Sequence, residues 1–145
     1  MTGLVKVTLL ILILTSSYGT GATDLCDRVS EIRLLPFKGE RVDDTAFNSL
    51  LEAGVAAIPC LIERVTDTRK MRDPRQAPTY PDVRVGDVAY FVLVRLANID
   101  LVEMLPNRVQ EKYKTEGVYA YFDFARRKQN REWLRGKLRE RYRRK

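Results

Sequence analysis

The spacing of hydrophobic and polar positions predicts that most of this chain folds into helices. Apolar residues recur at helical intervals from about residue 46 onward, and a glycine interrupts the run, which predicts two consecutive helices. We expect the first helix to begin at an N-cap supplied by Asp43 or Asp44 and to end at Gly54, a residue type common at helix C-termini. The second should extend from Val55 to Val65, with Pro59 in its first turn, where a missing N–H group matters little. Its expected inward-facing residues are Ala56, Ala57, Cys60 and Leu61.

Residues 83–96 require a choice between helix and strand, because their valine and aromatic content favours a strand. The polar residues Arg84, Asp87 and Arg95 fall on one face at 100° per residue, whereas the 180° period of a strand splits them between both faces. This pattern favours a helix, with Asp87 at a solvated position. We expect this helix to be the central, most buried element. Its apolar stripe comprises Val85, Val88, Ala89, Val92, Leu93 and Leu96.

The pattern of residues in the C-terminal third of the chain predicts three further helices. One opens at Pro106, runs through Lys114 and is closed by Gly117. Residues 118–125 fit both a strand and a helical stripe, and we adopt the helix. The last helix is expected over residues 130–144. Its apolar ridge comprises Trp133, Leu134, Leu138 and Tyr142, and its helix-spaced ion pairs are Glu132–Arg135 and Glu140–Arg144.

The segment 67–82 differs from its surroundings because it has three prolines and no apolar periodicity. A loop of this length in a small domain is either a functional segment or a surface excursion, and both interpretations stay open. Together these patterns predict an all-α fold. We expect a single compact helical domain over residues 23–145, with the proline-rich loop 67–82 and a basic C-terminal helix at 130–144.

The first 22 residues have the pattern of a secretory signal peptide. A lysine-bearing start is followed by a short apolar run, Val7–Leu14, and by small residues that end near Gly21 or Ala22. The apolar run is too short to cross a bilayer, which needs about 20 residues. An uncleaved anchor and a buried amphiphilic strand are the alternative interpretations. We expect cleavage near residue 22 and a periplasmic or secreted mature protein.

The chain contains two cysteines, Cys26 and Cys60, and no histidine. Without histidine it lacks the usual general base and the usual zinc ligand, so we expect no metal, no cofactor and no catalytic residue. In an oxidising compartment the two cysteines are most simply joined in one disulfide, which the loop-entropy model values at about 3–4 kcal/mol. Two buried free thiols are the alternative.

Two segments of the predicted helices have sequences that resemble the two helices of a known repeat. Residues 54–62 have the sequence GVAAIPCLI, and residues 83–89 have the sequence VRVGDVA. The first run is similar to the G-x-x-A-I-P-x-L-I pattern of HEAT-like repeats, and the second to the start of the partner helix, where arginine and small residues are frequent. The resemblance covers about a third of the chain and implies a scaffold that binds other proteins, without catalysis. The chain departs from the family at residues 67–82, where these repeats have a tight turn, and it shows no second copy.

Charge is distributed unevenly along the chain. The 26 lysines and arginines outnumber the 19 aspartates and glutamates, and residues 126–145 alone carry +9 while the remainder carries −2. Such a cationic tail suits contact with an anionic surface or an acidic partner, although a solvated helix docked on the core is the simpler interpretation for most of its arginines. Export makes nucleic acid an unsuitable partner. The candidate partner-binding residues lie in the loop and at the junction before the last helix: Arg69, Arg72, Asp73, Arg75, Tyr80, Arg126, Arg127 and Lys128.

A cluster of tyrosines at Tyr113, Tyr119 and Tyr121 suits either an interface or the rim of the core. The leading functional hypothesis is therefore a non-enzymatic exported protein-binding module, with an inhibitor or immunity-type protein as one form of it. The alternative is an envelope-associated protein that binds anionic lipid or polymer through its basic C-terminal helix.

A third hypothesis is a hydrolase that uses two neighbouring carboxylates as acid and base. The candidate pairs are Asp43 with Asp44 and Asp82 with Asp87. These residues are more simply explained as helix caps and solvated positions.

Overall fold

The computed structural model describes residues 25–37, 40–77 and 79–143, and these residues fold into helices and loops. The predicted all-α fold is confirmed, because the described residues form no strand beyond two isolated bridges. The predicted signal peptide, residues 1–22, lies outside the described residues. In chain order the elements are the 3₁₀ helix η1 (Arg28–Glu31), α2 (Thr45–Ala53), the 3₁₀ helix η2 (Gly54–Ala57), α3 (Ile58–Arg64), α4 (Val85–Leu96), α5 (Asn107–Glu116), α6 (Val118–Ala125) and α7 (Lys128–Arg143).

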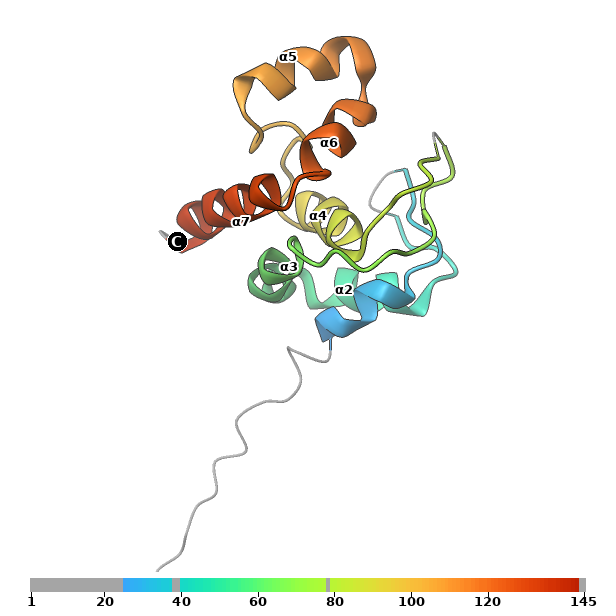
Figure 1. The fold of residues 1–145 in the computed structure, drawn as a ribbon. Helices are drawn as coiled ribbons and strands as arrows, with labels where there is room; N and C mark the ends of the chain where they lie inside the picture. The colour runs from blue at the N-terminus through green and yellow to red at the C-terminus, as the bar shows by residue number, and fades with distance from the viewer. Residues whose placement is uncertain (1–24, 38–39, 78, 144–145) are drawn as a thin grey trace, which may run out of the picture.

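Helix α4 lies at the centre of the domain, as predicted. Figure 1 shows α2 and α3 below it, α5 and α6 above it, and α7 alongside. Every residue from Val85 to Val94 is buried, so α4 is covered on all sides by α3 and the other elements. A helix with this all-round burial forms the core of a domain. Helix α5 packs mainly against α6 and extends away from the rest of the bundle.

Asp44 is the cap that starts α2, as one of the two predicted alternatives. Its Oδ1 accepts a hydrogen bond from the backbone N–H of Phe47 at 2.9 Å, the usual capping contact. Its Oδ2 accepts from the N–H groups of Arg33 at 2.7 Å and Leu34 at 3.0 Å. Gly54 ends the helix at φ 57°, a conformation that favours glycine. One carboxylate therefore joins the N-terminal segment to α2.

The stretch Thr45–Arg64 is long and apolar enough to cross a membrane by length and composition, with a mean hydropathy of 1.5. Gly54 divides it into α2 and α3, and both helices contact α4. The 3₁₀ turn η2 between them shifts the side-chain phase, because it has three residues per turn instead of 3.6. The prediction that Ala56 faces inward is therefore wrong. Ala56 is exposed, while Ala57 and Leu61 are buried.

Cys26 and Cys60 form the predicted disulfide, with Cα atoms 6.0 Å apart. Cys26 itself is buried in the core next to η1. The bond joins the segment before η1 to α3.

The segment 67–82 forms no helix and is fastened by backbone hydrogen bonds at several points. Met71 donates to the Val83 carbonyl at 3.0 Å, and Leu35 donates to the Pro74 carbonyl at 2.8 Å. The loop thereby joins residues before α2 to residues before α4. Figure 1 shows it beside the segment that leads into α2.

Helix α7 buries a different ridge from the predicted one. Leu134 and Leu138 are buried as expected, but Trp133 is 39% exposed and packs edge-to-face with Phe124, at a centroid distance of 5.9 Å. Arg131 occupies the buried position one turn before Leu134 instead. The predicted ion pair Glu132–Arg135 is present, and Arg144 of the second predicted pair lies outside the described residues.

Candidate functional site

The predicted partner-binding residues do not form one surface, because the fold separates them. Arg69 pairs with Asp67 at 2.6 Å and stays largely exposed, and Arg72 is exposed in the loop. Arg126, Arg127 and Lys128 are exposed at the junction between α6 and α7, as the sequence predicts. The rest are Asp73, Arg75 and Tyr80, and their side chains pack inward.

Asp73 and Arg75 form an internal ion pair that shapes the loop. The Arg75 Nη2 and Nε atoms donate to the two oxygens of Asp73 at 2.6 and 3.0 Å, and the Asp73 side chain is only 5% exposed. The Tyr80 N–H donates to the same carboxylate at 2.7 Å. Burial alone would raise the pKa of Asp73, but the hydrogen bonds from Arg75 and Tyr80 lower it. Asp73 therefore holds the loop in shape, and a partner has little access to it.

Tyr80 joins this loop to the C-terminal helices. Its ring stacks on Phe122 at a centroid distance of 4.1 Å and an interplanar angle of 6°. Its hydroxyl accepts a hydrogen bond from Arg126 at 3.2 Å. The guanidinium of Arg75 also lies over Phe122, 4.8 Å from the ring centre, and it is 5.3 Å from the ring centre of Phe91.

A groove lined by aromatic and arginine side chains lies next to Arg75. It consists of two cavities of about 340 and 680 Å³ that share five lining residues, and we call it the aromatic groove. Its walls come from the segment before α2, the loop, the end of α4 and the turn between α5 and α6. The shared lining residues are Phe37, Arg75, Arg95, Tyr113 and Val118.

Arg95 is the unusual residue of the aromatic groove. It donates to the carbonyl oxygens of Phe91 at 2.9 Å and Pro36 at 2.7 Å, and it forms no ion pair with any described carboxylate. Among the described residues, its Nε is the single buried side-chain nitrogen or oxygen without a hydrogen-bond partner. Burial lowers the pKa of Arg95, Arg75 lowers it further, and Glu40 opposes the shift. The groove thus contains a partly buried cation without a bonded counter-ion.

The rim of the groove exposes large apolar side chains. Phe37 is 87% exposed and Tyr119 is 43% exposed. Of the predicted tyrosine cluster, Tyr113 and Tyr119 line the groove, whereas Tyr121 is buried in the core. Arg95 and Phe37 were not predicted as candidate site residues, because no local motif contains them.

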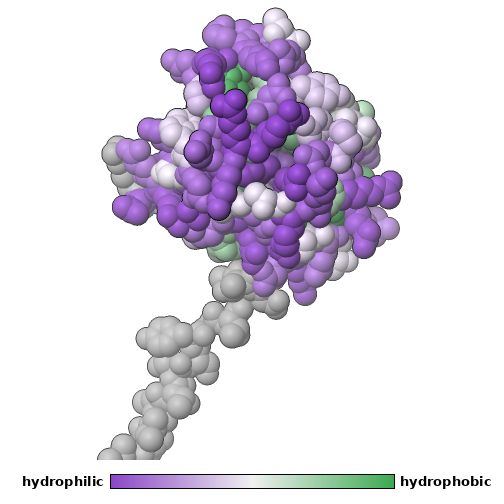
Figure 2. Space-filling view, in the orientation of Figure 1, coloured by the Kyte–Doolittle hydropathy of each residue, from purple (hydrophilic) through white to green (hydrophobic). Residues whose placement is uncertain are grey.

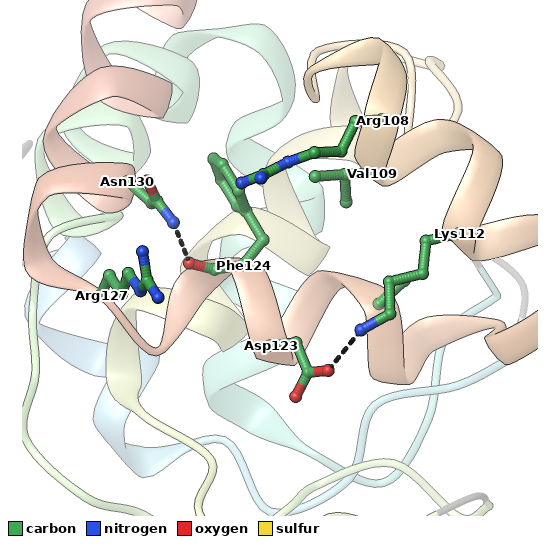
Figure 3. Close-up of a pocket in the computed structure, with 8 residues that line it drawn as sticks. Arg108, Val109, Lys112, Asp123, Phe124, Arg127 and Asn130 are labelled. Atoms are coloured by element: carbon green, nitrogen blue, oxygen red, sulfur yellow. Dashed lines mark hydrogen bonds and ion pairs between the residues drawn. The ribbon is translucent and has the colours of Figure 1, made fainter.

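A second cavity, of about 300 Å³, lies between α5 and the junction of α6 with α7, and we call it the basic cleft. Figure 3 shows Arg108 extending from α5 toward Phe124, and Arg127 beside Asn130. Lys112 donates to Asp123 at 2.7 Å across the cleft. This hydrogen bond lowers the pKa of the Asp123 carboxyl and raises that of Lys112. The predicted site residue Arg127 is thereby placed in a cavity.

Most cations of α7 are already paired within the domain. Arg131 pairs with Asp87, and Arg139 and Arg135 both lie at ion-pair distance from Glu63. Arg141 pairs with Glu103. Figure 2 shows hydrophilic side chains over most of the face seen in the orientation of Figure 1. The charge of the basic helix is therefore largely balanced by acids of the same domain.

The prediction that Asp87 lies at a solvated position is wrong. Asp87 is fully buried and accepts hydrogen bonds from the Tyr121 hydroxyl at 2.9 Å and the Arg84 N–H at 2.8 Å. Arg131 lies 2.8 Å from the same carboxylate. The polar face of α4 is covered because α7 supplies a buried arginine for it. Burial raises the pKa of Asp87, and Arg131 opposes that shift.

Three of the four carboxylates proposed for a hydrolase are engaged in the fold, and the fourth, Asp43, is exposed. Asp44 caps α2, and Asp82 pairs with Arg84 at 2.8 Å. Asp82 and Asp87 line one small cavity, but both oxygens of Asp87 already accept hydrogen bonds. Within the described part of the chain, no group of three His, Cys, Asp or Glu residues is arranged to hold a metal ion.

Comparison with known proteins identifies no relative: no family model, curated protein or solved structure matches the chain.

Proposed function

We propose that this chain is a non-enzymatic, exported protein-binding module that receives a segment of its partner in the aromatic groove. The observation that supports this most directly is Arg95, a partly buried cation that no described carboxylate neutralises. A carboxylate from a partner, placed in the groove beside the guanidinium, would supply the missing counter-ion. The proposed ligand is therefore a segment with a carboxylate beside an apolar side chain.

The exposed aromatic residues at the rim support a protein partner. Protein interfaces concentrate aromatic and arginine residues in their centres, and Phe37 and Tyr119 expose such surface next to Arg95. A small soluble ligand would not need the side chain of Phe37, which points largely into solvent. An inhibitor or immunity-type protein remains one form of this proposal.

The pairing of the α7 cations favours the groove over the alternative function. If the basic helix gripped anionic lipid or polymer, its arginines would have to exchange their partners Glu63, Glu103 and Asp87 for the ligand. Binding in this way would break the existing ion pairs. The aromatic groove needs no such exchange, because Arg95 has no carboxylate to release.

Export and the HEAT-like helix pair are part of the same proposal. The disulfide between Cys26 and Cys60 supports a mature protein in an oxidising compartment. The packing of α3 on α4 supports a helix pair over the segments that resemble the repeat.

Site-specific photo-crosslinking tests the proposed function. A photoreactive phenylalanine analogue at Phe37 should crosslink one partner in exported protein, and the same analogue at Val55 should not. Val55 is a suitable control because it is also apolar, is 73% exposed and lies on η2, outside the lining of the groove.

The crosslinked segment is then identified by mass spectrometry and made as a peptide. We expect it to contain a carboxylate beside an apolar residue, and to bind the wild-type protein at least about tenfold more tightly than an Arg95→Lys variant, which has fewer and differently arranged donors. Equal crosslinking at Phe37 and Val55, or equal affinity of the two proteins for the peptide, would contradict the proposal.

A further inference from the structure

Two arginines of the basic cleft have no partner among the residues that the structure describes. Arg108 on α5 and Arg127 at the α6–α7 junction line the same cavity, and neither side chain forms a hydrogen bond or an ion pair with a described residue. Lys112 in the same cavity is held by Asp123 at 2.7 Å and Glu116 at 3.2 Å. The pairing that neutralises α7 is therefore absent at this point of the surface.

The charges that line the cleft leave an excess of two positive charges. Arg108, Lys112 and Arg127 are cations, and Asp123 is the one anion among the lining residues. Guanidinium groups present several N–H donors in one plane, which suits a tetrahedral oxyanion with several acceptor oxygens. A phosphate group, with one negative charge in a lipid diester and up to two in the free ion, would offset this excess.

The floor of the cleft strengthens an interaction with an anion. Val109, Ala120 and Phe124 are buried apolar residues, and they limit the access of water to one side of the cavity. Ion pairs at such a partly shielded site are stronger than in bulk water, because the effective dielectric constant is lower. The cavity of about 300 Å³ is at the small end of ligand sites, which suits a single phosphate group better than a macromolecular segment.

The N-terminal end of α7 adds to the electrostatic attraction of these side chains for an anion. The Arg127 carbonyl accepts the backbone N–H of Asn130 at 3.0 Å, so the helix begins at the cleft. The N-terminal end of a helix has a partial positive charge, and the first turn of α7 has no acidic residue to offset it. This contribution comes in addition to the two unpaired arginines.

We propose that the basic cleft binds a phosphate group through Arg108 and Arg127, separately from the protein partner of the aromatic groove. The phosphate can belong to a free ion or to a lipid headgroup, and the two sources are separable by experiment. The proposal differs from binding along the basic helix, because it uses the two cations at the cleft that the domain leaves unpaired.

Calorimetric titration with inorganic phosphate tests the site in the whole protein. We expect saturable binding to the wild-type protein, weakened by added salt. Arg108→Gln and Arg127→Gln should each weaken it about tenfold, the effect of losing one charged hydrogen-bonding partner, and the double variant should abolish it. Arg33→Gln is the matched control, because Arg33 is exposed, its side chain forms no hydrogen bond or ion pair with a described residue, and it lines no part of the cleft. All variants should keep the wild-type melting temperature.

Vesicles distinguish the two sources of phosphate. If vesicles of phosphatidylglycerol bind the wild-type protein and not the double variant, and phosphatidylcholine vesicles bind neither, the source is an anionic headgroup. Binding of inorganic phosphate without vesicle binding assigns a free phosphate ligand. The proposal is overturned if neither inorganic phosphate nor phosphatidylglycerol vesicles bind, if the double variant binds as well as the wild type, or if Arg33→Gln loses as much affinity as the cleft variants.

Discussion

The guanidinium of Arg131 on α7 lies 2.8 Å from the carboxylate of Asp87 on α4, and the two side chains are only 5% and 1% exposed. A second nitrogen of Arg131 donates to the Val65 carbonyl at 3.3 Å, just after α3. One side chain therefore joins the last helix to the two helices at the centre of the domain. Because both charges are buried, each depends on the other for its stabilisation.

Replacing Arg131 with methionine should lower the free energy of unfolding by about 3–5 kcal/mol, because it leaves the Asp87 charge buried and unpaired. Urea denaturation at pH 7 measures this loss. The loss should be smaller at pH 4, where protonation of Asp87 removes the unpaired charge.

The double variant Asp87→Leu, Arg131→Met is the control for this prediction. It removes both charges together, so we expect it to be clearly more stable than Arg131→Met alone. A loss below about 1 kcal/mol in the single variant would show that the pair does not hold α7 to the core.

Gly86 should tolerate no side chain, because α4 approaches the preceding loop at this point. A Cβ atom at Gly86 would collide with the Val65 carbonyl oxygen and lie 2.9 Å from that of Asp67. Gly86→Ala should therefore lower the free energy of unfolding by about 1–3 kcal/mol.

The matched control is Gly136→Ala, in the exposed part of α7. A Cβ atom at Gly136 meets nothing within 4 Å, so alanine should stabilise the helix by about 0.5–1 kcal/mol. Thermal denaturation of both variants measures the contrast. Equal effects at the two glycines would refute the close approach at Gly86.

The helices could be predicted from the sequence because their signals are local. Asp44 and Gly54 mark the two ends of α2 in the chain itself, and the spacing of Arg84, Asp87 and Arg95 indicated a helix over residues 83–96. The same spacing led to the wrong prediction that Asp87 is exposed to solvent. Periodicity shows which residues share a face, but only the packing of α7 determines that the polar face of α4 is covered.

The candidate sites were less predictable, because they depend on contacts between distant segments. Arg127 could be identified from a local cluster of charge at a helix junction. Arg95 and Phe37 come together only when the segment before α2, the loop and the α5–α6 turn meet, and no local pattern encodes that meeting. Asp73 was predicted as a partner-binding residue of the loop, but Arg75 and Tyr80 bind its carboxylate within the fold.

The disulfide should contribute about 3–4 kcal/mol to stability, because it lowers the conformational entropy of the unfolded chain between Cys26 and Cys60. The double variant Cys26→Ser, Cys60→Ser removes the bond without leaving a free thiol, and its urea midpoint measures the loss. Thiol titration of denatured, unreduced protein from the exported fraction is the direct check. Two reactive thiols in that sample would contradict the disulfide and weaken the case for export.

Acid should destabilise the protein through its paired carboxylates. The pKa values of Asp67, Asp73 and Asp123 are lowered in the folded state, where arginine or lysine and backbone donors bind the ionised form. A lowered folded-state pKa stabilises the fold above the ordinary carboxyl pKa of about 3.8, and this stability is lost as the pH falls through the folded-state value. Asp87 acts in the opposite direction, because burial raises its pKa. We expect the unfolding free energy to fall from about pH 4 downward, since the lowered carboxylates outnumber Asp87.

Asp73→Asn separates the buried carboxylate from the exposed ones in this acid response. Because Asp73 is nearly buried and bound by Arg75 and Tyr80, its removal should cost about 1.5–3 kcal/mol at pH 7, and progressively less as the pH falls below the ordinary carboxyl pKa of about 3.8. Asp123→Asn should change the response far less, because its ion pair with Lys112 is half exposed and screened by solvent. Urea denaturation of the three proteins between pH 2 and 7 measures the slopes. If Asp73→Asn kept the wild-type dependence on pH, its carboxylate could not be the buried, ionised group that the loop is built around.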